Sequence, residues 1–137
     1  MKKLALTDFT KYRYPSALEL SPDGRYLTFA LKEVDREGDG YRWNLWLYDL
    51  ESRESRQITR GDQQQQAVWE DNTHILYKTT ELDETMRARG FEGEWTVYHR
   101  LNVCTGEECE AFRLPMSVSG LWKMDEGRYI FTGETHL

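Results

Sequence analysis

The stretch Leu20–Phe29 reads LSPDGRYLTF, and its pattern occurs three times along the chain. The second copy is Val68–Tyr77, VWEDNTHILY, and the third is Leu121–Phe131, LWKMDEGRYIF. Each copy has a short apolar run, an acidic turn and an alternating apolar run, which predicts two antiparallel strands joined by a tight turn. Phe29, Tyr77 and Phe131 occupy equivalent positions at spacings of 48 and 54 residues.

The second half of each unit also repeats. A strand, a polar turn and a returning strand follow each of the first two copies. From Thr59 to Trp69 is ten residues, and from Phe112 to Trp122 is also ten. The strands are Asn44–Leu50 and Arg56–Thr59 in the first unit, and Val97–Val103 and Glu110–Leu114 in the second. A repeat of this length, with four strands to a unit, is typical of a β-propeller blade.

The predicted fold is therefore all-β, a partial β-propeller of about two and a half four-stranded antiparallel blades. A leader spans residues 1–15 and contains a short helix within Thr7–Tyr14, which ends before a proline. Blade one covers 16–60 and blade two covers 66–115. Residues 117–137 are the first two strands of a third blade. We expect Trp69 and Trp122, on equivalent first strands, to pack between blades, with a ligand platform as the alternative.

Composition excludes several partners. The chain has 137 residues and a net charge of -6, so nucleic acid is disfavoured because phosphate binding needs a basic surface. No apolar run approaches the ~20 residues that span a bilayer. The basic start is interrupted by Asp8 and Lys11 before a secretory signal can form. We therefore expect a cytoplasmic protein.

The two cysteines, Cys104 and Cys109, flank the turn around Gly106. A hairpin there would place them nearly opposite each other, and a cross-strand disulfide is geometrically feasible. In a reducing compartment, two free thiols are the favoured interpretation.

No catalytic, metal or cofactor site is predicted. The string nearest to a G-x-S-x-G nucleophile turn is Met116–Gly120, which lacks the first glycine and lies at a blade connection. His74, His99 and His136 have no partner at metal or triad spacing in the sequence.

Two connections are unusually long. Val34 to Tyr41 joins the second and third strands of blade one, and Leu82 to Glu94 does the same in blade two. Both are expected at the same face of the propeller, as a solvated loop or one that contacts a ligand or another domain. The candidate contact residues of the longer loop are Asp83, Glu84, Arg87, Arg89, Phe91 and Glu92.

The blade motifs resemble a known family. Ser21–Phe29, Leu45–Leu50 and Arg56–Thr59 resemble the blade signature of TolB-like and peptidase propellers, and the segment from Leu6 to Ser16 is similar to the start of acylaminoacyl-peptidase-like members of the prolyl oligopeptidase family. The resemblance implies an N-terminal propeller that covers a separate α/β-hydrolase domain and restricts access to short peptides. Some members bind the substrate amino group through propeller glutamates, but no motif assigns that role to Glu84, Glu92 or Glu94.

Two and a half blades leave both flanks of the propeller open. We expect the flanks to be covered by the missing blades and hydrolase domain of a parent protein, or by self-association. The expected function is a non-catalytic, substrate-gating part of a cytoplasmic serine peptidase of the acylaminoacyl or dipeptidyl type. A non-enzymatic TolB-like scaffold for proteins or peptides is the alternative. An independent hydrolase is disfavoured because the nucleophile is missing.

Overall fold

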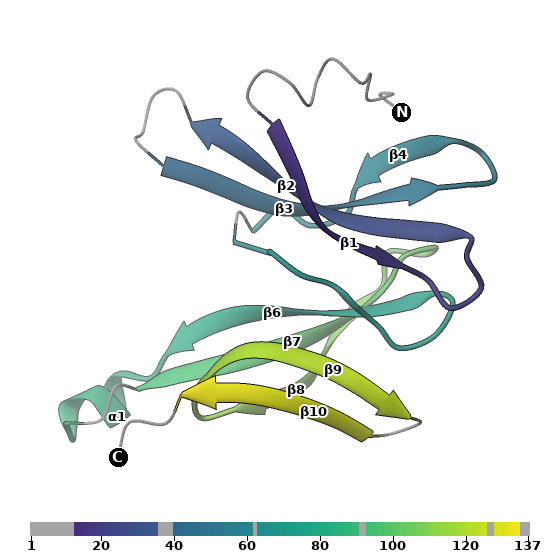
Figure 1. Ribbon diagram of the computed structural model, residues 1–137. Helices are drawn as coiled ribbons and strands as arrows, with labels where there is room; N and C mark the ends of the chain where they lie inside the picture. Colours follow the sequence, from purple (N-terminus) through teal and green to yellow (C-terminus); the bar gives the residue numbers. More distant parts are fainter. Residues whose placement is uncertain (1–12, 36–39, 62, 91–92, 126–127, 135–137) are drawn as a thin grey trace.

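The computed structural model describes residues 13–35, 40–61, 63–90, 93–125 and 128–134 (Figure 1). Within these ranges, ten strands form three antiparallel sheets, and one short helix lies between two of the strands. The first sheet contains β1 (Arg13–Leu20), β2 (Tyr26–Asp35), β3 (Gly40–Asp49) and β4 (Glu54–Gln57) in that order. The second contains β5 (Val68–Trp69), β6 (His74–Leu82), β7 (Glu94–Asn102) and β8 (Glu108–Leu114), with α1 (Glu84–Ala88) between β6 and β7. The third pairs β9 (Ser117–Asp125) with β10 (Arg128–Glu134).

Acidic side chains shape the turns of the repeat. The carboxylate of Asp23 accepts hydrogen bonds from the Ser21 hydroxyl and the Arg25 backbone N–H, at 2.7 and 3.1 Å. Asp71, at the equivalent place in the second copy, accepts the backbone N–H groups of Thr73 and His74, both at 2.8 Å. Short acidic side chains favour such local bonds in turns. The predicted turns of the first two copies are confirmed, and residues 126–127 in the turn of the third copy lie outside the described residues.

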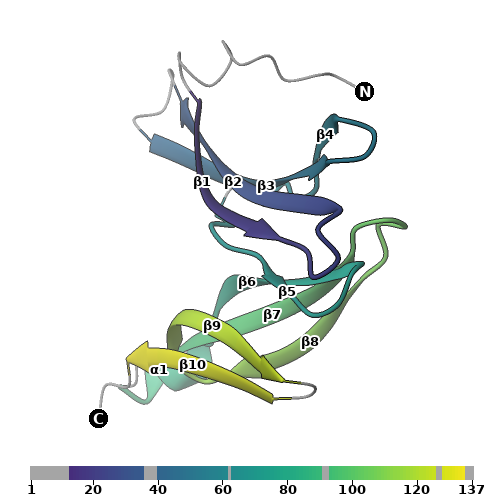
Figure 2. The same cartoon turned by 45° about the vertical axis from the view of Figure 1, so that its right-hand side comes forward.

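Strand β6 of the second sheet is buried on both faces at residues 75–77, which explains the uninterrupted apolar run there. Ile75 and Tyr77 pack toward the first sheet, in a cluster with Ala30 and Leu45. Leu76, between them in sequence, points the other way and packs against Leu121 of the third sheet. Successive side chains of a strand point to opposite faces, so one strand serves two interfaces. Figure 2 shows the three sheets stacked in this order.

The third sheet has an exposed outer face. Leu121 is buried against the second sheet, whereas Trp122 and Ile130, paired across the two strands, are 51% and 48% exposed. Met124, on the same face as Trp122, is exposed as well. Trp69 is buried and stacks on Tyr26 of the first sheet, as expected, but the expectation that Trp122 packs between blades is wrong for this chain. The face that carries Trp122 has no sheet beyond it among the described residues.

Two local expectations are wrong. The leader helix was predicted to reach Tyr14, but Arg13 and Tyr14 already belong to β1 and pair with Glu33 and Lys32. A residue before proline disfavours helical backbone, and the edge of the first sheet offers pairing instead. Residues 7–12 of the predicted helix lie outside the described part of the chain.

The second concerns the two cysteines. They do not face each other: Cys109 pairs with Arg100, while Cys104 lies in the turn that joins β7 to β8. Both thiols are free and exposed. Cys104 lies in the turn, beyond the last residue pair of β7 and β8. Its spacing from Cys109 in the sequence therefore does not place the two side chains opposite each other.

Candidate functional site

The long connection between β6 and β7 is folded around Asp83. The carboxylate accepts the backbone N–H of Thr85 at 3.0 Å and the indole N–H of Trp95 at 3.2 Å. The backbone N–H of Asp83 donates to the Gly93 carbonyl at 2.6 Å, which closes the loop at its base. The sequence did not predict α1, because its five residues are too few for a helical period to register. Of the predicted contact residues, Asp83 therefore organises the loop itself.

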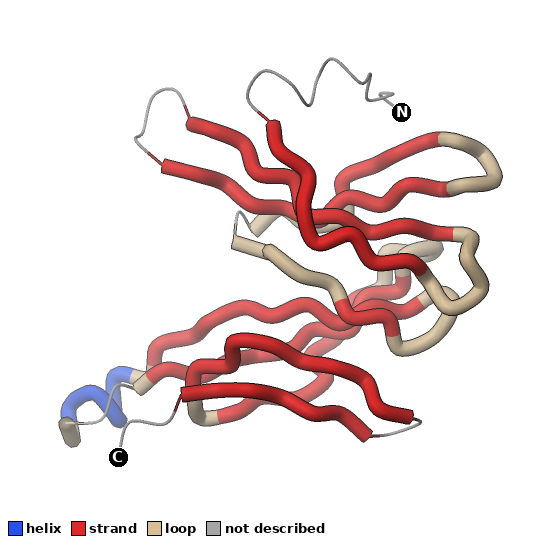
Figure 3. Tube along the Cα trace, in the orientation of Figure 1, coloured by secondary structure: helices blue, strands red, loops and turns tan. Residues whose placement is uncertain are grey.

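The remaining predicted contact residues are distributed along this loop. Glu84, Arg87 and Arg89 are exposed on and beside α1. Phe91 and Glu92 lie outside the described residues. Figure 3 shows α1 at the same side of the molecule as the end of β2 and the start of β3. The strand ends that flank the two long connections thus lie on one side of the chain, and residues 36–39 of the first connection lie outside the described residues.

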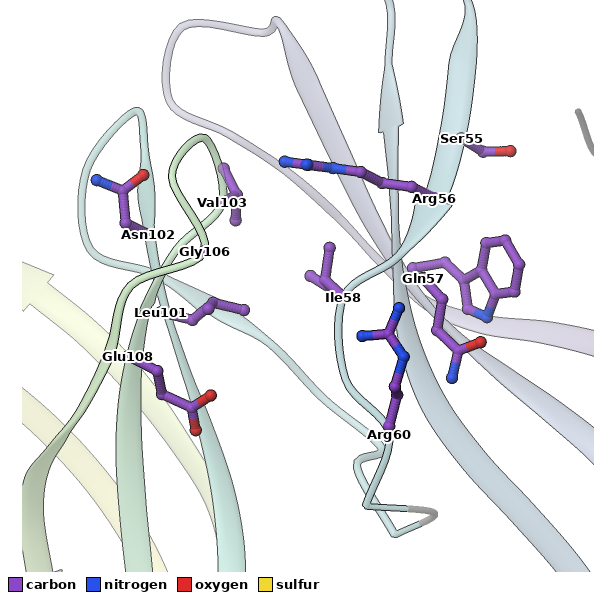
Figure 4. Close-up of a pocket in the computed structure, with 11 residues that line it drawn as sticks. Ser55, Arg56, Gln57, Ile58, Arg60, Leu101, Asn102, Val103, Gly106 and Glu108 are labelled. Carbon is purple, nitrogen blue, oxygen red and sulfur yellow. The ribbon is translucent and has the colours of Figure 1, made fainter. Parts of the chain in front are cut away.

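A cavity of about 580 Å³ lies between the first two sheets, and sequence reasoning missed it. Its apolar wall includes Leu101 and Val103, both buried, and Ile58, which is partly buried. Arg56 and Arg60 line the side formed by β4 and the segment after it (Figure 4).

Glu108 lines the side of the cavity that the second sheet contributes. The hydroxyl of Tyr77 donates a hydrogen bond to its carboxylate, and the Nδ1 atom of His99 lies 3.6 Å from the same oxygen. Nε2 of His99 is 2.7 Å from the Thr79 hydroxyl. Burial, and then the bond to Glu108, raise the pKa of Tyr77, so it stays protonated and donates. These side chains hold Glu108 in place.

A second polar cluster, around Glu70, joins the second sheet to the third. Its carboxylate accepts two hydrogen bonds from the Arg100 guanidinium and one, at 2.6 Å, from the Tyr129 hydroxyl. The backbone carbonyl of Glu70 also accepts a hydrogen bond from Lys123. Burial raises the pKa of Glu70, but the bonds from Arg100 and Tyr129 outweigh it and leave that pKa below its usual range. The carboxylate is ionised at neutral pH and works as a structural clamp.

Within the described ranges, no group of three or more His, Cys, Asp and Glu side chains is placed to hold a metal ion. None of the helical residues in the same ranges makes a span long and apolar enough to cross a bilayer.

The arrangement of the sheets is found in solved structures. The chain is similar to the β-propeller domain of the Trilobed protease from Pyrococcus furiosus, described as having an open velcro topology, with a TM-score of 0.58 and 12% identity over 82% of this chain and 31% of that one. The chain folds as part of a β-propeller. A second similar structure is the acylaminoacyl peptidase of Pyrococcus horikoshii, with a TM-score of 0.59 and 12% identity over 88% of this chain and 17% of that one. A third is the AtxE2 isopeptidase in its apo form, with a TM-score of 0.58 and 15% identity over 89% of this chain and 21% of that one.

The partial propeller spans less than a third of the length of each of these three chains. No family model matches the sequence. No curated protein matches it either. We name the three sheets of this partial propeller blades one, two and three, so the cavity lined by Arg56, Arg60 and Glu108 lies between blades one and two, and the Glu70 cluster joins blade two to blade three.

Proposed function

We propose that this partial propeller belongs to a cytoplasmic serine peptidase of the prolyl oligopeptidase family, of the acylaminoacyl or dipeptidyl type. Its role is to restrict which substrates reach a hydrolase domain that lies elsewhere in the parent protein. The observation that carries the proposal is the likeness in fold to the propeller domain of the Trilobed protease, together with the likeness to an acylaminoacyl peptidase and an isopeptidase.

The exposed outer face of the third sheet supports a larger propeller. Ile130 occupies the position in its strand that Leu76 occupies in β6, and Leu76 is fully buried against the following sheet. Ile130 and Trp122 are about half exposed. Burying apolar surface stabilises by roughly 25 cal/mol per Å². We propose that a further blade covers this face in the parent protein, and that a second copy of the chain does so when the chain is alone.

The side that carries α1 is the proposed contact with the hydrolase domain. Glu84, Arg87 and Arg89 present charges of both signs there, and Asp83 holds their loop in a defined shape. Long loops on a rigid scaffold commonly make such contacts. Phe91 and Glu92 complete the proposed surface on the evidence of the sequence alone.

A fluorophosphonate probe, which labels the nucleophile of serine hydrolases, tests the proposal. The isolated chain is expected to stay unlabelled. Native immunoprecipitation from the source cells, with an antibody against this chain, is expected to recover a labelled polypeptide that contains or binds it. Stoichiometric labelling of the isolated chain would show that it is itself an enzyme. Recovery without any labelled polypeptide would indicate the non-enzymatic scaffold instead.

Sedimentation velocity tests whether a second copy of the chain covers the exposed outer face of the third sheet. The chain alone is expected to associate as its concentration rises, and the double variant W122E/I130E is expected to remain a monomer, because burying two carboxylates at that face is unfavourable. The variant E51Q/E107Q, which changes exposed residues away from the face, is the control and should associate like the unmodified chain. A monodisperse monomer at high concentration contradicts self-association.

A further inference from the structure

The cavity between the first and second blades has the composition of a ligand site. Leu101 and Val103 are 4% and 2% exposed, and together with Ile58 they give the cavity an apolar wall. The volume of about 580 Å³ is that of a site for a small ligand. A ligand that fills it needs an apolar group to cover this wall.

Two guanidinium groups flank the apolar wall. Arg25, Arg42, Arg100, Arg113 and Arg128 each lie within 4.0 Å of a carboxylate. Arg56 and Arg60 have no such partner within the ranges that the structure describes. Figure 4 shows Arg56 reaching from β4 toward the turn that carries Val103, and Arg60 rising beside Ile58. Arginine forms paired, charge-assisted hydrogen bonds with carboxylates, which suits it to hold an anionic ligand group.

The charge on the opposite side limits which anion fits. Glu108 carries a negative charge into the same cavity, and the Tyr77 hydroxyl keeps it in place. Two arginines against one carboxylate leave a local charge of about +1, in a chain whose net charge is -6. A dianion such as phosphate exceeds this surplus and would leave one unbalanced negative charge beside Glu108, in a chain that is already acidic. A carboxylate carries one charge and matches the surplus.

We propose that this interblade cavity binds an apolar carboxylate, with the exposed Arg56 and Arg60 on the β4 side supplying the positive charge that attracts the carboxylate and with the apolar group on Leu101, Val103 and Ile58. The chemistry is shared by the C-terminal residue of a peptide and by a free apolar carboxylic acid. The site is separate from the proposed hydrolase contact at α1 and does not depend on the peptidase assignment.

An NMR titration of the full 137-residue chain tests the site. The probes are acetyl-Ala-Ala-Leu with a free carboxylate, the same peptide as a C-terminal amide, N-acetyl-leucine and inorganic phosphate. The free-acid peptide is expected to shift the backbone amide signals of Leu101, Val103 and Gly106, and the amide should bind at least about tenfold more weakly because it lacks the charge. Tighter binding of the peptide than of N-acetyl-leucine assigns the site to peptide ends, and equal binding assigns it to free acids. Equal binding of acid and amide, phosphate binding better than both, or no shift of these signals would overturn the proposal.

Matched variants separate a specific site from general charge. R56Q/R60Q removes the two cavity guanidiniums, and R53Q/R89Q removes the same charge from two exposed arginines that do not line the cavity. The first should weaken binding of the free-acid peptide by about tenfold or more, and the second by less than about twofold. Both variants should keep the dispersed amide spectrum of the folded chain. An equal loss in the two variants would mean that net charge, and not this cavity, drives binding.

Discussion

Replacing Glu70 with glutamine tests the clamp between the second and third blades. In the native chain the Glu70 carboxylate, only 13% exposed, accepts hydrogen bonds from Arg100 and from the Tyr129 hydroxyl. Glutamine keeps the size of the side chain but removes the charge, and its amide N–H₂ group cannot accept from the guanidinium. The substitution therefore perturbs the electrostatics of the interface while leaving its packing intact.

The expected loss follows from the geometry. A hydrogen bond to a charged group contributes about 1.5–3 kcal/mol net. Glu70 has three such contacts, but the Arg100 side chain is 41% exposed, so water compensates part of the loss on its side. We expect E70Q to lower the free energy of unfolding by about 2 kcal/mol at pH 7. Urea unfolding, followed by tryptophan fluorescence at one fixed protein concentration, measures it.

The pH dependence gives a second readout. The folded-state pKa of Glu70 lies below that of an unfolded glutamate, about 4.3. Its contribution to stability is therefore present above about pH 4.3 and is lost as the pH falls through the folded-state pKa. Because glutamine does not titrate, the difference in stability between the native chain and E70Q should shrink toward zero in that acidic range.

The matched control is E51Q. Glu51 is paired with Arg25 at 3.5 Å, but its side chain is 75% exposed, so the change should cost less than about 0.5 kcal/mol. If E70Q and E51Q were equally mild at pH 7, or if the effect of E70Q persisted undiminished in acid, the clamp would not work as argued.

Three other changes have clear expected outcomes. Leu76→Ala removes a fully buried side chain between blades two and three and should cost about 2–5 kcal/mol by urea unfolding; a cost below about 1 kcal/mol would mean that the third blade does not pack there. Gly93→Ala should cost more than Gly90→Ala in the same assay, because both positions have positive φ but only at 93 would the new Cβ lie 2.5 Å from the Asp83 carbonyl oxygen; equal costs would place that carbonyl elsewhere. Trp69→Phe removes the indole N–H that donates to a β1 carbonyl at 3.2 Å, so it should lower stability by about 1 kcal/mol and unchanged stability would argue against that bond.

Local patterns in the sequence predicted the strands well because each strand is specified by its own residues. The turn chemistry of Asp23 and Asp71 and the apolar run from Ile75 to Tyr77 gave the correct hairpins and their order. Where the pattern depended on a neighbour, the prediction was less successful. The repeat aligns Trp122 with Trp69, but Trp122 pairs with Ile130, the equivalent of Leu76, whereas Trp69 pairs with Ile75. This shift of one residue turns Trp122 to the outer face of its sheet, where it is exposed.

The polar sites could not be predicted, because they join residues far apart in sequence. Glu70 meets Arg100 and Tyr129 from 30 and 59 positions away. Arg56 and Glu108 share a cavity only because two blades are stacked. A blade repeat predicts that blades will pack, but not which charged side chains face each other across the gap. The long connection of blade two was flagged by its length alone, and its organisation by Asp83 emerged only from the structure.

The most direct test of the propeller assignment is a set of NOE contacts between neighbouring sheets. The account predicts contacts between the rings of Tyr26 and Trp69, whose centroids are 6.3 Å apart, and between the methyl groups of Leu76 and those of Leu121. The first pair links blade one to blade two, and the second links blade two to blade three. Observing both would confirm consecutive stacked blades, whereas the absence of either pair in a folded, assigned chain would contradict the partial propeller.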